Sequence, residues 1–241
     1  MKVFCVVTPS HKILYERFFL PSLDTESFEL CSSFLDQEGN GDFLADDFKN
    51  CIRFKLTKII ESIQNSPDAI IVWSDIDLQF FGLKPNHISS YFEPDFDFVA
   101  QRLNNRDPQV CGGFYAIRCS ERTLKFFEHV EEITRSQTGG NEQDAINLVL
   151  SASSLKISWR FFGPEFYART HGISIPVNAV LHHATGLVPG NAVQHKILLL
   201  EQLEDFEKWG NIRRRLFGWR QVPASLKRKL AAAAAGRFYR L

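Results

Sequence analysis

The feature that most constrains this fold is a helix followed at once by a short apolar strand. Between Asp47 and Gln64, the side chains of one face recur at steps of three and four residues, which predicts a helix. They are Phe48, Cys51, Ile52, Lys55, Ile59 and Ile63. The sequence NSPD ends this helix, and the apolar run Ala69–Trp73 follows as a buried strand. A helix that leads directly into a buried strand favours a layered α/β domain.

The rest of the chain repeats this alternation. Further strands are predicted at Val3–Val7, Phe28–Phe34, Phe96–Gln101 and Gly113–Ile117 and near Ile157, and further helices at Glu16–Leu23, after Ser120 as N-cap, and at Glu142–Ser151. Strands that alternate with helices predict a mostly parallel central sheet flanked by helices. No linker precedes about Gly210, so we expect one domain over residues 1–210 and a basic helical tail over residues 211–241.

Composition excludes several classes of protein. Apolar residues make up 44% of the 241 residues, which excludes a disordered chain. No apolar run approaches the roughly 20 residues of a membrane span, and the start MKVFCVVTPSHK lacks a secretory pattern. The five cysteines are odd in number and form no C-x-x-C motif, which favours reduced cysteines over disulfides or a zinc site. We therefore expect a cytoplasmic protein.

Two carboxylates, Asp75 and Asp77, end the apolar strand that begins at Ala69. In an open α/β sheet, ligands bind at the carboxyl ends of the strands. Carboxylates this close repel each other unless they share a cation, and oxygen ligands suit Mg²⁺ or Mn²⁺. The pair therefore predicts half of a site for a metal ion and a diphosphate. The alternative is that Asp75 caps a turn and Asp77 is merely solvated.

A second motif is HHATG, which covers residues 182–186. An imidazole can complete a manganese site, and Gly186 lets the backbone approach a phosphate closely. A histidine that is simply buried, or simply on the surface, is the alternative.

A third motif is NEQDAINLVL, which begins at Asn141. Asn141 can cap a helix, with Asp144 three residues on as in a capping box. The polar groups of Glu142, Gln143 and Asp144 also lie at a helix N-terminus, where hydroxyls and phosphates can be held. Both roles can coexist.

The fourth motif is VCGGFYAIR, in which Gly112 and Gly113 precede an apolar strand. Two glycines here either let the backbone pack against a ligand or make a bulge.

The segments WSDIDLQFF, CGGFYAIR, NEQDAINLVL and HHATG, in this order, resemble the GT-A-fold glycosyltransferases. The likeness spans roughly Lys2 to Lys196. It is nearest to the nucleotide-diphospho-sugar transferases allied with the plant cell-wall α-xylosyltransferases and the glycogenin-like family. Two departures stand out. Cys111 occupies a place where relatives often carry Asn, and the Lys-Pro-Trp signature of the glycogenin-like group is absent after Gly186.

The resemblance implies roles for single residues. Asp75, Asp77 and His183 would bind Mn²⁺ or Mg²⁺, with His182 the less favoured histidine of the pair. Residues implied to bind the nucleotide-sugar donor are Thr8, Ser10, Lys55, Asp75, Ile76, Gly186 and Lys196. The catalytic positions implied beside the transferred sugar are Asp75, Gln143 and Asp144, none of them as a nucleophile.

The resemblance also implies an activity. We expect metal-dependent transfer of a sugar from a nucleotide-diphosphate donor, a UDP-sugar, with retention of configuration, to a glycan or lipid-linked acceptor. Two other classes stay open at this point. One is a non-catalytic module that binds sugar nucleotides or glycans without metal dependence. The other is a nucleotidyl- or phosphotransferase that uses the D-x-D pair for two metal ions.

Charge is unevenly distributed although the formal net charge is zero. Nine of the 28 basic residues follow Gly210 and no acidic residue does, so the first 210 residues carry 19 basic and 28 acidic groups. One interpretation of residues 211–241 is a helix at an anionic membrane surface, which would suit a lipid-linked acceptor and a peripheral place at the inner membrane surface. The other is a solvated helix packed on the acidic body. Nucleic acid is not expected as a partner, since the body is acidic.

Overall fold

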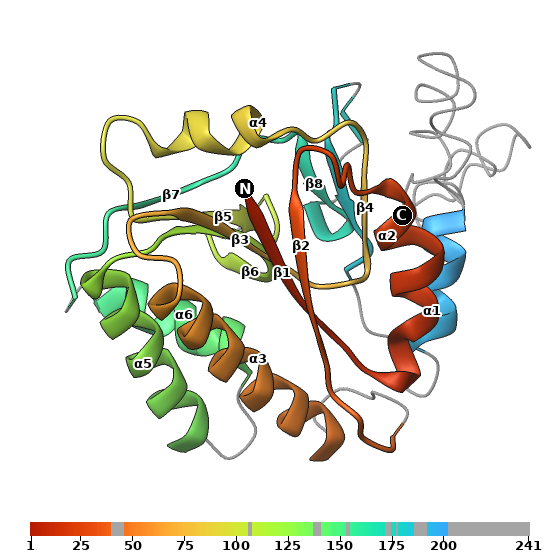
Figure 1. Ribbon diagram of the computed structural model, residues 1–241, viewed down its shortest axis with the longest axis horizontal. Coiled ribbons are helices and arrows are strands. Elements are labelled where there is room, and N and C mark those ends of the chain that lie inside the picture. The colour runs from red at the N-terminus through yellow and green to blue at the C-terminus, as the bar shows by residue number, and fades with distance from the viewer. Residues whose placement is uncertain are drawn as a thin grey trace, which may run out of the picture.

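The structure is a computed structural model that describes residues 1–39, 46–105, 108–136, 141–152, 155–171, 175–176, 178–185 and 192–201 (Figure 1). The predicted tail, residues 211–241, lies outside the described residues. Within them, no helix combines the length and the apolar character that a membrane span requires.

Six strands form the main sheet in the order β2-β1-β3-β6-β5-β7. They are β1 Lys2–Val7, β2 Glu29–Phe34, β3 Ile70–Ser74, β5 Phe98–Arg102, β6 Val110–Arg118 and β7 Trp159–Phe161. β1 pairs in parallel with β2 and β3, and β5 pairs in parallel with β7. β6 runs antiparallel to both of its neighbours, β3 and β5. The predicted α/β fold with a mostly parallel sheet is therefore confirmed, with β6 as the antiparallel strand.

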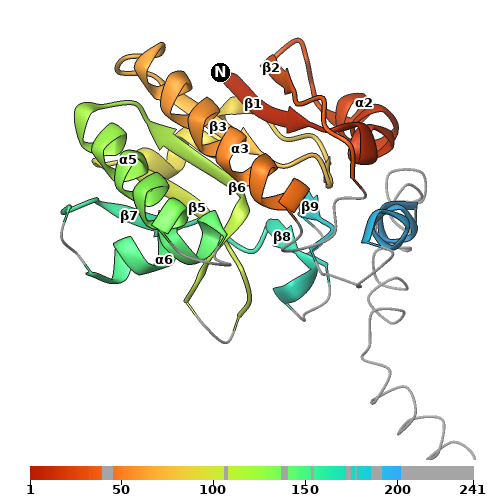
Figure 2. The ribbon, with the colours of Figure 1, turned by 90° about the horizontal axis from the view of Figure 1, so that it is seen from below.

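Side chains of the central strands alternate between two cores because successive residues of a strand point to opposite faces. In β3, Val72 packs into one core, while Ile71 and Trp73 pack into the other. Helices α3 Asp46–Gln64, α5 Glu121–Ser136 and α6 Glu142–Ala152 cover the Trp73 face together (Figures 1 and 2). The short helix α4 Pro85–Ser89 and a second sheet cover the other face.

The second sheet has three strands in the order β4-β9-β8. They are β4 Leu78–Phe80, β8 Phe166–Ala168 and β9 Leu181–His183. β4 and β9 are antiparallel, and their register sets Leu78 opposite His183. Since β4 begins one residue after Asp77, this pairing brings a histidine from far along the chain beside the acidic pair.

A helical segment follows β1 and lies beside the last described helix, residues 192–201, which is blue in Figure 1. The segment runs through η1 Pro9–His11, α1 Lys12–Leu14, η2 Tyr15–Phe19 and α2 Leu20–Ser22. Leu14 and Phe18 pack against Ile197 and Leu200 in one small core. This packing holds the helix of residues 192–201 near the end of β1. The segment begins earlier than the predicted helix Glu16–Leu23.

The starts of three strands differ from the predictions by two or three residues. β5 begins at Phe98 rather than at Phe96. β6 begins at Val110, so Gly112 and Gly113 lie inside the strand rather than before it. β7 begins at Trp159, two residues beyond the predicted position near Ile157, since the pairing with Phe98–Ala100 of β5 decides where this strand starts.

Substitution of Phe114 is a test of the core between the two sheets. This residue is fully buried, and its ring centroid lies 5.7 Å from that of Phe162 and 5.8 Å from that of Phe166. Phe114→Ala would leave a cavity, so we expect the free energy of unfolding in urea to fall by about 3–5 kcal/mol. Phe34, which is 65% exposed, is the matched control, and Phe34→Ala should cost less than about 1 kcal/mol. Equal losses would contradict the described core.

Candidate active site

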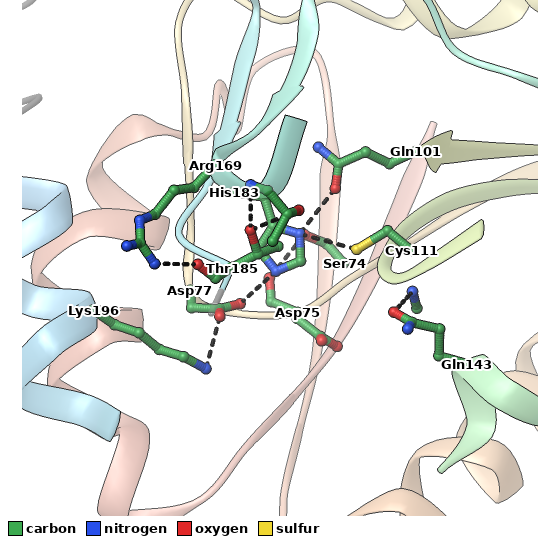
Figure 3. Close-up of polar contacts among 12 residues, drawn as sticks. Ser74, Asp75, Asp77, Gln101, Cys111, Gln143, Arg169, His183, Thr185 and Lys196 are labelled. Carbon is green, nitrogen blue, oxygen red and sulfur yellow. Dashed lines mark hydrogen bonds and ion pairs between the residues drawn. The ribbon is translucent and has the colours of Figure 1, made fainter. Parts of the chain in front are cut away.

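Asp75, Asp77 and His183 converge just beyond the end of β3 (Figure 3). One possible ligand atom from each residue lies within 4.8 Å of the others, and His183 Nε2 lies 3.3 Å from Asp77 Oδ1. Asp77 and His183 are buried, while Asp75 is partly exposed. Two carboxylates and an imidazole that share one small space are a donor set suited to Mn²⁺ or Mg²⁺.

Backbone hydrogen bonds fix the turn that carries the two aspartates. The amide of Asp75 donates to the carbonyl oxygen of Gly113 at 2.7 Å, and the amide of Ala184 donates to the carbonyl oxygen of Asp77 at 3.0 Å. The turn is therefore held between β6 on one side and the end of β9 on the other. The position of each carboxylate follows from the backbone of two sheets rather than from a mobile loop.

The carboxylate of Asp77 is neutralised by two cationic side chains. Lys196 Nζ lies 2.8 Å from Asp77 Oδ2, and His183 lies at the other oxygen. Burial opposes ionisation of Asp77, but the charges of Lys196 and His183 hold the pKa of its carboxyl well below the ordinary value. Burial opposes the charge on His183 as well, yet Asp77 raises the pKa of the imidazole to about 10. Asp77 is thus a buried anion that requires a cation beside it.

The carboxylate of Asp75 is held by a different lysine. Lys55 is 4% exposed, and its Nζ donates to Asp75 Oδ1 at 2.7 Å, to Glu142 Oε1 at 2.6 Å and to the carbonyl oxygen of Gly112 at 2.9 Å. Burial opposes its charge, but Asp75 and Glu142 raise the pKa of Lys55 well above the ordinary value. These three bonds use all three N–H donors of the ammonium group. Lys55 therefore fixes Asp75 to the start of α6.

From the sequence, Glu142 was placed among the polar groups at the start of a helix but was not assigned to the site. It is 4% exposed, and its carboxylate faces Lys55 across the site. Its neighbour Gln143 accepts a hydrogen bond from the Gly112 amide at 3.0 Å. Little in the sequence points to this role. Glu142 follows the cap residue Asn141 at the start of an amphipathic helix, where an acidic side chain is expected to be solvated.

The two glycines of β6 make room for side chains of the site. A Cβ atom on Gly113 would lie 2.1 Å from Cε1 of His183, and one on Gly112 would lie 2.9 Å from Glu142 Oε1. No side chain larger than hydrogen fits at Gly113 without moving the imidazole. The glycine pair therefore admits His183 and Glu142 to the site, which neither of the two sequence interpretations had anticipated.

His182 points to the opposite face of β9 from His183, as alternation along a strand requires. It is fully buried and its ring stacks on Tyr167 with centroids 5.4 Å apart. Within the described part of the chain, neither ring nitrogen has a hydrogen-bond partner. Burial, and then the charge of His183, lower the pKa of His182 to about 3. His182 is a neutral core residue, so the preference for His183 as the ligand agrees with this geometry.

A pocket of about 140 Å³ opens beside the acidic pair. Its lining includes seven of the predicted site residues, namely Thr8, Ser10, Lys55, Asp75, Ile76, Asp77 and Lys196. His11 and Phe48 also line it and were not predicted. His11 Nδ1 lies 2.9 Å from Ser10 Oγ, which ties the two side chains together at the pocket wall. Gly186 lies outside the described residues.

Neither Gln143 nor Asp144 is among the residues that line this pocket. The amide of Asp144 donates to Asn141 Oδ1 at 2.9 Å, which confirms Asn141 as the cap, and the Asp144 side chain is exposed. The Gln143 side chain is occupied by the Gly112 amide (Figure 3). Their catalytic roles stay predictions.

Comparison with known families now adds to this geometry. Residues 68–179, less than half of the chain, match the model of the nucleotide-diphospho-sugar transferase family. This segment is therefore similar to members of that family. It contains the acidic pair, the glycine pair and the start of α6. No curated protein sequence matches the chain.

Solved structures of similar fold are also glycosyltransferases. One is a glycosyltransferase involved in the glycosylation of the major capsid of PBCV-1, with 12% identity, a TM-score of 0.54 and coverage of 83% of this chain and 98% of that chain. Another is the apo form of the glycosyltransferase GlyE of Streptococcus pneumoniae TIGR4, with 12% identity, a TM-score of 0.52 and coverage of 85% and 63%. At this identity they show the shared fold alone. The match over residues 68–179 and the shared fold agree with the GT-A-type glycosyltransferase that the motifs had implied.

The two adjacent histidines form a matched pair of variants. His183→Ala should abolish Mn²⁺ binding measured with UDP present, since it removes the imidazole of the cluster. His182→Leu should leave Mn²⁺ binding unchanged, and it should not lower the unfolding midpoint by much, because it replaces two buried nitrogens that lack partners with apolar atoms. Isothermal titration measures the first quantity and thermal unfolding the second. A loss of Mn²⁺ binding in His182→Leu alone would reverse the assignment.

Proposed function

We propose that this protein transfers a sugar from a nucleotide-diphosphate donor, a UDP-sugar, to a glycan or lipid-linked acceptor with retention of configuration. In this proposal Asp75, Asp77 and His183 hold a divalent metal ion, Mn²⁺ or Mg²⁺, at the wall of the donor pocket. The observation that carries it is the convergence of these three residues with Lys196 beside one pocket.

The residues present fit a divalent ion. Asp77 is buried, and Lys196 and His183 hold the pKa of its carboxyl low, so it is an anion in a place where positive charge is stabilised. Asp75 is partly exposed toward the pocket, so the cluster is open on the side where a diphosphate would complete it. When bound, the ion would supply positive charge to the leaving diphosphate, whose negative charge grows as the sugar–phosphate bond breaks.

The remaining roles follow from side-chain chemistry. Lys196 would turn from Asp77 to the diphosphate and stabilise the charge of the leaving group. Lys55, with its donors fully used, would orient Asp75 rather than contact the donor itself. Thr8 and Ser10 offer hydroxyl groups for the nucleoside, and Ile76 offers an apolar wall.

Gln143 and Asp144 are proposed to position the transferred sugar or the acceptor, with Asp75 at the junction. None acts as a nucleophile in this proposal, since the acceptor would attack from the face that the diphosphate leaves. Glu142 joins the proposed set because it shares the Lys55 ammonium group with Asp75.

The other two classes remain the alternatives. A two-metal transferase needs ligands for a second ion, and the cluster of Asp75, Asp77 and His183 is the one group of three such residues found among the described residues. This favours sugar transfer over two-metal phosphotransfer. A cytoplasmic location remains part of the proposal, supported by five free cysteines. The membrane-contact interpretation concerns residues 211–241, which lie outside the described residues.

Thermal unfolding with nucleotides tests the proposed function. UDP or a UDP-sugar with Mn²⁺ should raise the unfolding midpoint by mass action, and a chelator should remove the shift. Asp77→Ala should remove the same shift while the protein stays folded, and Glu121→Gln, an exposed carboxylate of α5, should keep it. A shift that survives the chelator would favour a non-catalytic binding module. Unchanged Mn²⁺–UDP binding in Asp77→Ala would refute the site.

Lys196 gives an independent prediction because it has two competing partners. It now neutralises Asp77 at 2.8 Å, and in the proposal it later serves the diphosphate. Lys196→Met should therefore weaken UDP binding at saturating Mn²⁺ by at least about tenfold, the loss of one charged hydrogen bond. The same variant should bind Mn²⁺ alone more tightly than the parent, since the competing ammonium is gone. Titration calorimetry measures both affinities, and a parallel loss of both would contradict the competition.

A further inference from the structure

The imidazole of His183 has two nitrogens with different surroundings. Nε2 faces Asp77 Oδ1 at 3.3 Å. Nδ1 lies 2.9 Å from Gln101 Oε1 and 3.5 Å from Cys111 Sγ (Figure 3). A cation shared with Asp77 is therefore reached through Nε2. The charged ring carries a proton on each nitrogen, so an ion that binds Nε2 must displace the proton there, and the remaining proton must then reside on Nδ1.

The orientation of the Gln101 amide decides which group faces Nδ1. Gln101 Nε2 donates to the carbonyl oxygen of Phe166 at 3.1 Å. A carbonyl oxygen only accepts hydrogen bonds, so the NH₂ group of Gln101 must face Phe166 and its oxygen must face His183. That oxygen in turn only accepts, so it favours a proton on Nδ1. A flipped amide would set two carbonyl oxygens against each other.

The thiol of Cys111 competes only weakly for the same nitrogen. An S–H group that donated to Nδ1 would favour the opposite tautomer, with the proton on Nε2. At 3.5 Å from Nδ1 it is farther away than the Gln101 oxygen, and sulfur is a weak donor. The amide therefore outweighs the thiol.

Gln101 lies where an apolar residue would be expected. It is fully buried in β5 directly after Phe98–Ala100, which are fully buried as well. A buried amide is costly unless both of its ends are hydrogen-bonded, and both ends of Gln101 are. Through these two bonds Gln101 links β5 of the main sheet to β8 and β9 of the small sheet, beside the proposed metal ligand.

We propose that Gln101 is a positioning residue that holds the His183 proton on Nδ1 and so presents Nε2 to the metal ion. The inference rests on the metal site of the proposed function and adds a residue that lies outside it. Gln101 acts through His183 and does not contact the substrate.

Three variants test this role in the whole chain. Gln101→Met keeps the approximate side-chain volume and removes the acceptor, and it should weaken Mn²⁺ binding, measured by electron paramagnetic resonance with UDP present, by about 10–100-fold. Gln101→Glu should stay within about threefold of the parent, because a neutral carboxyl group keeps one acceptor for His183 and one donor for Phe166. Gln79→Met is the matched control. It removes an amide from β4 of the small sheet, and the Oε1 atom of that amide has no hydrogen-bond partner in the described residues. This variant should leave Mn²⁺ binding unchanged.

The metal-free unfolding midpoint of each variant separates loss of structure from loss of metal binding. Mn²⁺ binding equal to the parent in a folded Gln101→Met would overturn the inference. So would a Gln101→Glu variant that binds as weakly as Gln101→Met.

A second measurement uses the parent alone and so does not depend on how the variants fold. In ¹⁵N-histidine-labelled protein with Mg²⁺ and UDP, the Nδ1 resonance of His183 should be that of a protonated ring nitrogen. An unprotonated Nδ1 overturns the inference while the metal site stands. If the parent binds no Mn²⁺ at all, the proposed metal site itself is refuted, and the inference is refuted with it. That result is distinct from an unprotonated Nδ1 in a protein that binds the ion.

Discussion

The pairing of β4 with β9 is the interaction on which this site depends. The strand β4 begins at the residue after Asp77, and its register sets Leu78 opposite His183. The hydrogen bond from the Ala184 amide to the Asp77 carbonyl closes the same pair. A slip of one residue would turn every β9 side chain to the other face and would exchange His183 for His182. The small sheet is therefore what joins an acidic pair near the middle of the chain to a histidine more than 100 positions later.

Buried charge is the second constraint, and it is balanced locally. Asp75 and Glu142 both contact the ammonium group of Lys55, while Asp77 contacts Lys196 and His183. Removing one partner of a buried ion pair typically costs about 3–5 kcal/mol, because the other charge is then left without compensation. The carboxylates are consequently held in place before any ligand arrives, and the pKa of the Asp77 carboxyl is held well below its ordinary value. Such prior orientation is what a site for a cation and a diphosphate requires.

Much of this arrangement could be predicted from local patterns. The apolar strand that ends at Asp75 and Asp77 predicts its own burial and the exposure of its carboxyl end. The helix over residues 46–64 was predicted to within one residue, because its apolar period is long and regular. The motif order indicated His183 rather than His182, and the alternation of β9 gives that preference a physical basis. The family match supports the same class of enzyme.

Other features could not be predicted because they depend on tertiary contacts. Glu142 resembles a solvated first-turn acid until α6 is docked against Lys55. Gln101 resembles an ordinary polar residue at a strand end until β8 and β9 are placed beside it. Gly113 of β6 has a clear purpose only once the imidazole of His183 is known to occupy the space that a Cβ atom would fill. In each case the decisive partner is more than 60 positions away in the sequence.

The central claim is that His183 and a nucleotide diphosphate meet at one metal ion. Electron spin echo spectroscopy of the protein with Mn²⁺ and UDP tests this most directly, because it detects nuclei bound to the ion. We predict coupling to one directly coordinated imidazole nitrogen and to phosphorus of the diphosphate in the same sample. Coupling to phosphorus without any nitrogen would contradict it, since the ion would then be bound without His183.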